Sequence, residues 1–282
     1  SIMPYSPAYI DVTSHAADVI WEEMADGSFK KRIKRKSPGT FGLCAALKYK
    51  FDIDPVPHLL CSGFTREETE DALIELNYLG VENLLLIRGD SKVVKPVRED
   101  RSVNAFALDL VSQVNAMNHG KYLGELIDAQ PSDFCIGVAC YPEKHFEAPN
   151  LAFDVENLLK KQQAGAHYAV TQMFFDNQRF FKFVEMARAA GVTIPIVPGL
   201  KIITTRDHLN RIPSVFHTDF PDELTQRLVA ARDNKEAQAV GIDWTHRQCV
   251  ELLEAGYNNL HFYIMQYTRP FTTLMDRLSL TM

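Results

Sequence analysis

Short apolar runs alternate with amphipathic stretches along most of the chain. Seven of these runs have the length and the β-branched or aromatic content of buried strands. They are Ala8–Thr13, Val56–Cys61, Asn83–Arg88, Phe134–Cys140, Tyr168–Met173, Ile194–Leu200 and Asn259–Tyr263. Strands that alternate with helices pair in parallel, and strands buried on both faces are apolar throughout. The pattern therefore predicts an α/β fold.

Helical patterns follow most of the predicted strands. In the clearest one, Thr65 and Glu68 have the spacing of a capping box, and the apolar positions behind them stop at Gly80. Glycines also end most of the later patterns. We predict further helices over Asp154–Ala164, Gln178–Ala190, Asp222–Arg232, Asn234–Gly241 and Trp244–Ala255.

An open doubly wound sheet and an eight-stranded barrel would both fit this alternation. No glycine-rich phosphate-binding motif follows the first strand, which argues against a dinucleotide-binding or P-loop fold. Polar residues instead gather at the carboxyl ends of several runs, as on the catalytic face of a (β/α)8 TIM barrel; they are Thr13, Arg88–Asp90, Tyr141–His145 and Gln172. We therefore predict one barrel domain over residues 1–282.

The strand count leaves this barrel one strand short. Seven strands are recognisable where closure needs eight, so we expect the first strand to be absent from the given sequence. The runs Ala8–Thr13 and Asn259–Tyr263 should then not be direct neighbours.

Composition narrows the functional classes. The 282 residues are 46% hydrophobic and 23% charged, with a net charge of -6 and a pI near 5.9, which gives no case for nucleic-acid binding. No apolar run has the length of a membrane span. The five cysteines form no CxxC pair and the histidines show no metal-ligand spacing, so we expect a cytoplasmic protein without a bound metal. The basic run Lys30–Lys36 is interpreted as a solvated loop or helix face, and Trp21 and Trp244 as core residues.

Several strand-end residues could form a binding site. Arg88, Gly89 and Asp90 combine a forked cation, a glycine that lets backbone approach a ligand, and a carboxylate. Taken alone, the trio is explained more simply as a strand-end turn with a surface ion pair. Tyr141–His145 is a loop dense in aromatic, acidic, basic and imidazole groups, and Gln172 supplies an amide.

A helical face could extend this site. Asp154, Asn157 and Lys161 are spaced i, i+3 and i+7, so they share one face of a helix. Such a row could hold ribose and pyrophosphate, although a solvated face has the same pattern.

Six segments in series resemble the methylenetetrahydrofolate reductase family, in particular its bacterial form, which is a catalytic barrel without a regulatory domain. They are PHLLC (Pro57–Cys61), LLLIRGD (Leu84–Asp90), CYPEKHFEA (Cys140–Ala148), VTQMFFDN (Val170–Asn177), VPGL (Val197–Leu200) and LHFY (Leu260–Tyr263). The resemblance implies a (β/α)8 barrel that binds FAD, and a role in one-carbon metabolism and methionine biosynthesis.

The same resemblance implies an activity and a set of site residues. The reaction would be reduction of 5,10-methylenetetrahydrofolate to 5-methyltetrahydrofolate by NAD(P)H, ping-pong through reduced flavin. Asp90 would be catalytic, and Gln172, Asp90 and Tyr141 would contact the folate or nicotinamide. The FAD-contacting positions would be Thr13, His58, Arg88, Gly89, Asp90, Ala107, Tyr141, His145, Ala148, Asp154, Asn157 and Lys161. We further expect a homo-oligomer.

The chain departs from the family pattern in three places. The family's general acid is a glutamate on the first strand, and it would lie outside the given sequence. The family's arginine after the last strand has no clean match behind Tyr263, and the stretch Lys92–Asn104 is short and charged, so we expect residues to be missing there. Two alternatives therefore stay open: a non-catalytic flavin-binding subunit, and a flavin dehydrogenase barrel with another substrate.

Overall fold

The computed structural model describes residues 2–14, 18–34, 39–89, 102–265 and 267–279. It divides into two compact units, which we call the N-terminal unit (Ala8–Ile136) and the C-terminal unit (Gly137–Met282 with Ser1–Pro7). The division falls inside a single β-strand. The expectation of one barrel domain over residues 1–282 stays a prediction.

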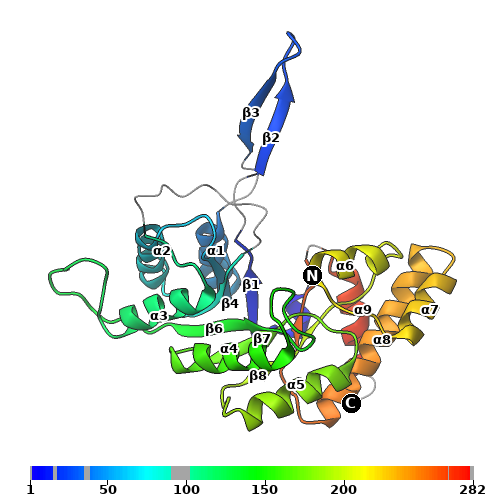
Figure 1. The fold of residues 1–282 in the computed structure, drawn as a ribbon. Helices are drawn as coiled ribbons and strands as arrows, with labels where there is room; N and C mark the ends of the chain where they lie inside the picture. The colour runs from blue at the N-terminus through cyan, green and yellow to red at the C-terminus, as the bar shows by residue number, and fades with distance from the viewer. Residues whose placement is uncertain (1, 15–17, 35–38, 90–101, 266, 280–282) are drawn as a thin grey trace. The chain divides into compact units, whose positions relative to one another are not determined.

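Parallel strands and helices alternate in the N-terminal unit. β1 pairs with β4 and β4 pairs with β5, all in parallel. Fully buried leucines from α2, β5 and α3 form its core. The elements are β1 (Tyr9–Val12), β2 (Asp18–Glu23), β3 (Phe29–Lys34), α1 (Thr40–Phe51), β4 (Asp54–Leu60), α2 (Arg66–Tyr78), β5 (Asn83–Ile87), α3 (Ala107–Asn118) and the start of β6 (Cys135–Cys140) (Figure 1).

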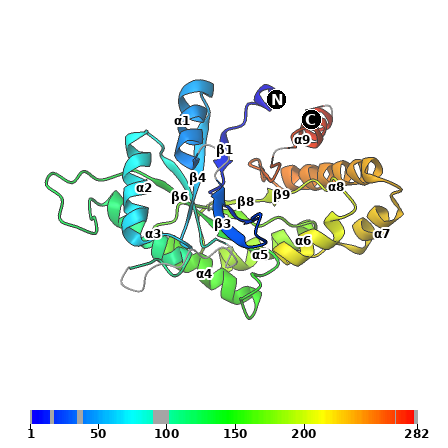
Figure 2. The ribbon, with the colours of Figure 1, turned by 90° about the horizontal axis from the view of Figure 1, so that it is seen from above.

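The predicted capping box is confirmed at the start of α2. The Thr65 hydroxyl accepts the Glu68 N–H at 3.0 Å, and the Glu68 carboxylate accepts the Thr65 N–H at 2.9 Å. Behind α2, Gly80 adopts a φ of 65° and ends the helical run as expected. α2 and α3 lie side by side in this unit (Figure 2).

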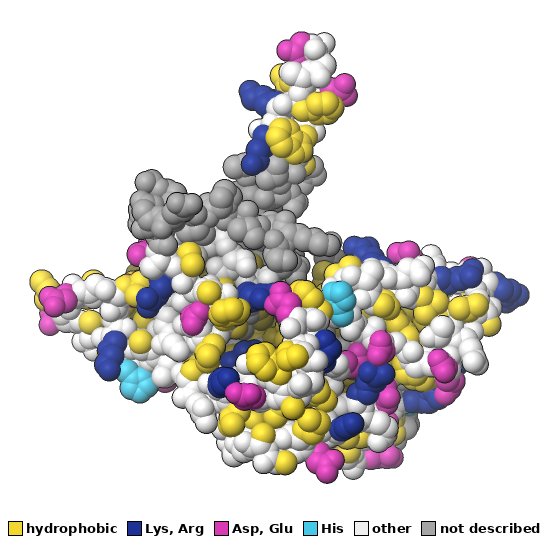
Figure 3. All heavy atoms as spheres, in the orientation of Figure 1, with side chains coloured by type: hydrophobic (Ala, Val, Ile, Leu, Met, Phe, Trp, Pro, Cys, Tyr) yellow, Lys and Arg dark blue, Asp and Glu magenta, His cyan; other side chains and the backbone are white. Residues whose placement is uncertain are grey.

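An antiparallel hairpin of β2 and β3 was not predicted. Trp21 is opposite Lys31 and Glu23 is opposite Phe29, and an Arg32–Glu22 ion pair joins the two strands. Trp21 is 63% exposed, so its interpretation as a core residue is wrong, and the part of the basic run in β3 is a strand rather than a loop or helix face. The short apolar run at Trp21 fits a helix as well as a strand. Its periodicity alone therefore did not distinguish a buried helix from an exposed hairpin. Figure 3 shows hydrophobic, basic and acidic side chains together on this hairpin.

The C-terminal unit also contains parallel strands between helices. β6 pairs with β7, β7 pairs with β8, and β9 pairs with β10. Its elements are the end of β6, α4 (Leu151–Gln163), β7 (Tyr168–Thr171), α5 (Asn177–Ala189), β8 (Ile196–Val197), β9 (Gly199–Leu200), α6 (His208–Phe216), α7 (Asp222–Ala230), α8 (Asn234–Glu254), β10 (His261–Phe262) and α9 (Arg269–Ser279), with the short helix η1 (Met3–Tyr5).

Two helices predicted in this unit are one. α8 runs without interruption from Asn234 to Glu254, through Gly241, where we expected the first helix to end. A Cβ at Gly241 would lie 2.0 Å from the carbonyl oxygen of Ile203. Gly241 therefore permits close packing of α8 against the backbone of Ile203 and does not end a helix. Trp244, further along α8, packs against the apolar cluster of this unit, as predicted.

The α/β class predicted from the apolar runs is confirmed, with strands and helices in the order of a (β/α)8 barrel. Each predicted strand overlaps an observed one, although β4 begins at Asp54, ahead of the predicted Val56–Cys61, and Ile194–Leu200 is divided at Pro198 into β8 and β9 because proline has no N–H for the ladder. The expectation that the first and last strands are not neighbours concerns different units and stays a prediction. Among the helices that the structure describes, none is long and apolar enough to cross a membrane.

Candidate functional site

Tyr141 and Gln172 lie side by side at the carboxyl ends of two paired strands. Cys140 on β6 is in register with Thr171 on β7, and the Gln172 N–H donates to the Cys140 carbonyl at 2.8 Å. The Gln172 Oε1 accepts the Met173 N–H at 3.0 Å, which leaves the amide nitrogen as a donor. The convergence predicted for these two residues is therefore present within the C-terminal unit.

The loop after β6 is held in place by the start of α4. The buried Asp154 carboxylate accepts the His145 N–H at 2.7 Å, and the Asn150 side chain caps α4 by accepting the Phe153 N–H. Burial raises the pKa of Asp154, although this hydrogen bond and nearby cations oppose the shift. The Lys144 ammonium donates to the Ala148 carbonyl at 2.8 Å. Asp154 thus fixes the loop that carries Tyr141 and His145.

A row of rings extends along this loop. The Tyr141 and His145 rings meet edge to face at 4.7 Å, His145 lies 4.6 Å from Phe146, and Phe146 stacks on His217 at 4.9 Å. Such a row offers an aromatic surface to a planar ligand. His145 and Ala148 therefore belong to the same loop structure as Tyr141.

The three predicted residues on α4 have different surroundings. Asp154 holds the loop, whereas the Lys161 ammonium donates to the Ala139 carbonyl of β6 at 2.9 Å. Asn157 is half-buried, and its amide has no hydrogen bond with the part of the chain that the structure describes. All three residues lie on α4 as predicted, and of these, Asn157 is the one whose amide makes no hydrogen bond with a described residue.

Glu143 is a candidate site residue that the sequence did not single out, although it lies in the predicted site loop Tyr141–His145. Its Oε2 accepts the Asp219 N–H at 2.9 Å, while its Oε1 is buried, 3.9 Å from the Arg179 Nε, and accepts no hydrogen bond from any described residue. Arg179 is bound more closely by Asp219, at 2.9 Å. Burial raises the pKa of Glu143 to about 7. This carboxyl group can therefore change charge near neutral pH.

The remaining predicted residues belong to the N-terminal unit. The His58 Nε2 lies 3.4 Å from the Asp11 Oδ2, with both side chains nearly buried, and it makes no well-aligned hydrogen bond with any residue that the structure describes. Arg88 follows β5, and its carbonyl accepts the Ser62 N–H at 3.0 Å. Gly89 has a φ of 86°, a conformation that favours glycine.

Two further predicted residues lie at strand and helix ends of this unit. Thr13 is exposed directly after β1, and Ala107 is the first residue of α3. Asp90, predicted to be catalytic, lies outside the described residues.

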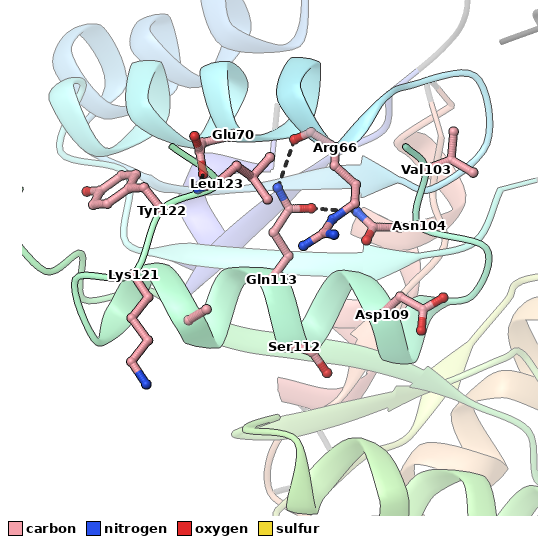
Figure 4. Close-up of a pocket in the computed structure, with 11 residues that line it drawn as sticks. Arg66, Glu70, Val103, Asn104, Asp109, Ser112, Gln113, Lys121, Tyr122 and Leu123 are labelled. Carbon is pink, nitrogen blue, oxygen red and sulfur yellow. Dashed lines mark hydrogen bonds between the residues drawn. The ribbon is translucent and has the colours of Figure 1, made fainter. Parts of the chain in front are cut away.

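A separate cavity of about 380 Å³ lies between α2 and α3 (Figure 4). Gln113 joins its polar groups, because its amide donates to the Arg66 carbonyl at 2.8 Å and accepts from Asn104 at 2.7 Å. Glu70 accepts the Leu123 N–H at 2.8 Å. These hydrogen bonds link α2 to α3 and to the segment after α3, while the buried Arg66 Nε has no hydrogen-bond partner among the described residues, and we interpret the cavity as part of the packing between the two helices.

Comparison with known sequences gives a consistent family. Residues 2–279 match the family described as methylenetetrahydrofolate reductase. Methylenetetrahydrofolate reductase 1 of Schizosaccharomyces pombe is 30% identical over 242 residues, covering 86% of this chain and 38% of that protein. Methylenetetrahydrofolate reductase (NADH) 1 of Arabidopsis thaliana is 32% identical over 256 residues, covering 86% and 40%. The chain thus spans about two fifths of the length of these relatives.

A bacterial relative and a solved structure extend the comparison. The 5,10-methylenetetrahydrofolate reductase of Pectobacterium carotovorum is 26% identical over 227 residues, covering 80% of this chain and 70% of that protein. The fold is similar to that of a Clostridium thermocellum protein described as binding two copies of 5-methyl-5,6,7,8-tetrahydrofolic acid, with a TM-score of 0.54 at 14% identity over 84% of this chain and 78% of that one. The family match covers nearly the whole sequence, and the chain belongs to the methylenetetrahydrofolate reductase family.

Proposed function

We propose that this protein reduces 5,10-methylenetetrahydrofolate to 5-methyltetrahydrofolate, with NAD(P)H as hydride donor and FAD as cofactor. The observation that carries the proposal is the family match over residues 2–279. The arrangement of Tyr141 and Gln172 at adjacent strand ends supports it, because substrate-binding groups of parallel α/β barrels lie there. Relatives named for NADH and for NADPH leave both donors within the proposal.

The residues of the C-terminal unit suit a flavin dinucleotide. Asn157 has an amide without a partner among the described residues, and the Lys161 ammonium on the same helical face donates to the Ala139 carbonyl at the end of β6. An amide and an ammonium on one helical face can bind ribose hydroxyls and phosphate oxygens. The edge-to-face rings of Tyr141 and His145 offer an aromatic surface to a planar ring.

In the N-terminal unit, the proposal assigns FAD contacts to Thr13, His58, Arg88, Gly89, Asp90 and Ala107. Gly89 supports this assignment, since its positive φ lets the backbone after β5 adopt a conformation in which its N–H can face a ligand. His58 supports it as well, because its buried Nε2 has no aligned partner in the part of the chain that the structure describes.

FAD, when bound, would accept hydride from the nicotinamide and pass it to the folate in two successive half-reactions. The chain's own residues would position the reactants. Asp154 would hold the loop of Tyr141 through the His145 N–H, and the Gln172 amide nitrogen, which donates to no described residue, would donate to a substrate carbonyl or ring nitrogen. Asp90 would place a negative charge beside the cationic iminium form of the folate and so favour hydride acceptance.

An absorbance spectrum of the purified protein tests this proposal. We expect a flavin spectrum, release of FAD rather than FMN on denaturation, bleaching by anaerobic NADH, and return of colour when methylenetetrahydrofolate is added. A colourless protein that takes up no added FAD would contradict the proposal.

The same experiment separates the two alternatives. Bleaching without reoxidation by the folate, but with reoxidation by other acceptors, would indicate a flavin dehydrogenase of another substrate. Bound FAD that no donor reduces would indicate a non-catalytic flavin-binding subunit.

A further inference from the structure

A second cavity, of about 200 Å³, lies beside the carboxyl ends of β9 and β10 in the C-terminal unit. Its wall is mostly apolar and aromatic, formed by Leu200, Ile202, Phe262, Ile264, Pro270 and Phe271 among others. Two nitrogen-bearing side chains, Lys201 and His208, also line it, and none of its described lining residues is an aspartate or glutamate.

Lys201 is a cation without an acidic partner. Its ammonium makes one hydrogen bond, to the Tyr263 carbonyl at 2.8 Å, and no ion pair with the residues that the structure describes. Burial alone lowers the pKa of Lys201, with no carboxylate opposing the shift. A partly buried cation that lacks a counter-ion costs stability, and a bound anion would offset that cost.

His208 adds an oriented donor to the same cavity. The Thr204 N–H donates to its Nδ1 at 3.3 Å, so the neutral ring carries its proton on Nε2. Burial, and then the nearby Lys201 and Arg211, lower the pKa of His208, although Asp207 opposes them. His208 is therefore neutral at pH 7 and can donate its Nε2–H to a ligand.

Two helix ends favour the same sign of ligand charge. His208 is the first residue of α6, and Pro270 and Phe271 are in the first turn of α9. The positive ends of both helix dipoles thus lie beside the cavity.

Tyr263 connects this cavity with the proposed substrate site. Tyr263 is one of the residues that line the cavity, and its hydroxyl donates to the Thr171 carbonyl at 2.7 Å, next to Gln172. Tyr263 is thus hydrogen-bonded both to Lys201, through its carbonyl, and to the end of β7 beside Gln172, through its hydroxyl.

We propose that Lys201 and His208 form a subsite for an anionic group, a carboxylate or a phosphate, on a substrate whose body lies against the apolar wall. The inference rests on the proposed function, since a folate carries carboxylates and a nicotinamide dinucleotide carries phosphates. The small volume suits such a group with part of its attached chain, rather than a whole cofactor.

Fragment binding tests this subsite without any turnover. The probes are p-aminobenzoylglutamate for the carboxylate source and ADP-ribose for the phosphate source, titrated by calorimetry into the full chain. Lys201→Met removes the charge and keeps an apolar stem, and Lys182→Met on the exposed side of α5 is the matched control. We expect Lys201→Met to lower the affinity for one fragment about tenfold or more, as for a lost hydrogen bond to a charged group. Lys182→Met should leave the affinity for both fragments unchanged.

The fragment whose affinity falls shows whether the anionic group is a carboxylate or a phosphate. The KM of the corresponding substrate should rise by a similar factor. His208→Phe should weaken the same fragment several-fold while Lys201 is intact, which keeps the test valid if Lys201→Met fails to fold. The proposal is overturned if neither fragment depends on Lys201 or His208, or if Lys182→Met weakens binding equally. Because fragments bind without hydride transfer, an inactive protein that still binds them through Lys201 would contradict only the proposed function.

Discussion

Glu143 has a carboxyl group in surroundings that disfavour its charge. Burial raises its pKa from 4.5 to about 7 in the folded protein. Below pH 4.5 the group is protonated in both the folded and the unfolded chain, so it has no effect on stability. Between 4.5 and about 7 the folded state holds a proton that the unfolded state has released, and stability falls as the pH rises.

Glu143→Gln should therefore stabilise the protein at high pH and not at low pH. The amide is nearly isosteric and keeps an acceptor for the Asp219 N–H, but it carries no charge to desolvate. Thermal unfolding of both proteins at about pH 5 and about pH 8 measures the difference. A constant difference across that range would show that the carboxyl titrates normally.

Asp90→Asn should slow reduction of the folate more than reduction of the flavin. Only the folate half-reaction passes through a cation that the carboxylate would stabilise, so its rate should fall about a hundredfold. Stopped-flow measurement of each half-reaction separates the effects. Equal slowing of both would make Asp90 a structural residue.

At the scale of elements, α4 combines support for the loop with proposed cofactor contacts. Asn157→Ala should weaken FAD binding about tenfold with little change in thermal stability, because its amide has no other described partner. Lys161→Ala should lower both the affinity for FAD and the thermal stability, since Lys161 also binds the Ala139 carbonyl. Lys160→Ala on the same helix is the control, because Lys160 is exposed and its one ion pair among the described residues is a surface pair with Glu156.

α8 offers a test of packing against helix propensity. Alanine forms helices better than glycine, yet Gly241→Ala should destabilise the protein by about 1–3 kcal/mol, because its Cβ would collide with the Ile203 carbonyl. Gly42→Ala, at an exposed position of α1, should instead stabilise by about 0.5–1 kcal/mol. Chemical denaturation of both variants gives the sign of the change in the free energy of unfolding. Stabilisation by Gly241→Ala would mean that α8 does not approach Ile203 so closely.

At the scale of the whole molecule, cofactor binding should appear as added stability. A ligand that binds only the folded chain stabilises it by about 2.7 kcal/mol at a hundred times its Kd. Added FAD should therefore raise the melting temperature in a concentration-dependent way, and FMN should do so less, because it lacks the part of the dinucleotide assigned to Asn157 and Lys161. Equal shifts with both flavins would remove those two residues from the site.

Local patterns were enough to predict most elements of this protein. Apolar runs gave the strands because parallel strands are buried on both faces, and the Thr65–Glu68 capping box gave the start of α2 because it is satisfied within one turn. The family could also be read from the order of six segments, since the residues of a binding site are specified in the sequence itself.

Only the tertiary structure decided features that depend on a distant neighbour. Gly241 has the same local sequence signal whether it ends a helix or packs against the Ile203 carbonyl, and Trp21 has the same apolar side chain in a core or on an exposed hairpin. The lowered pKa of Lys201 and the raised pKa of Glu143 both arise first from burial by the surrounding fold. Sequence patterns record a residue's own preferences, whereas burial and charge balance depend on what the fold places around it.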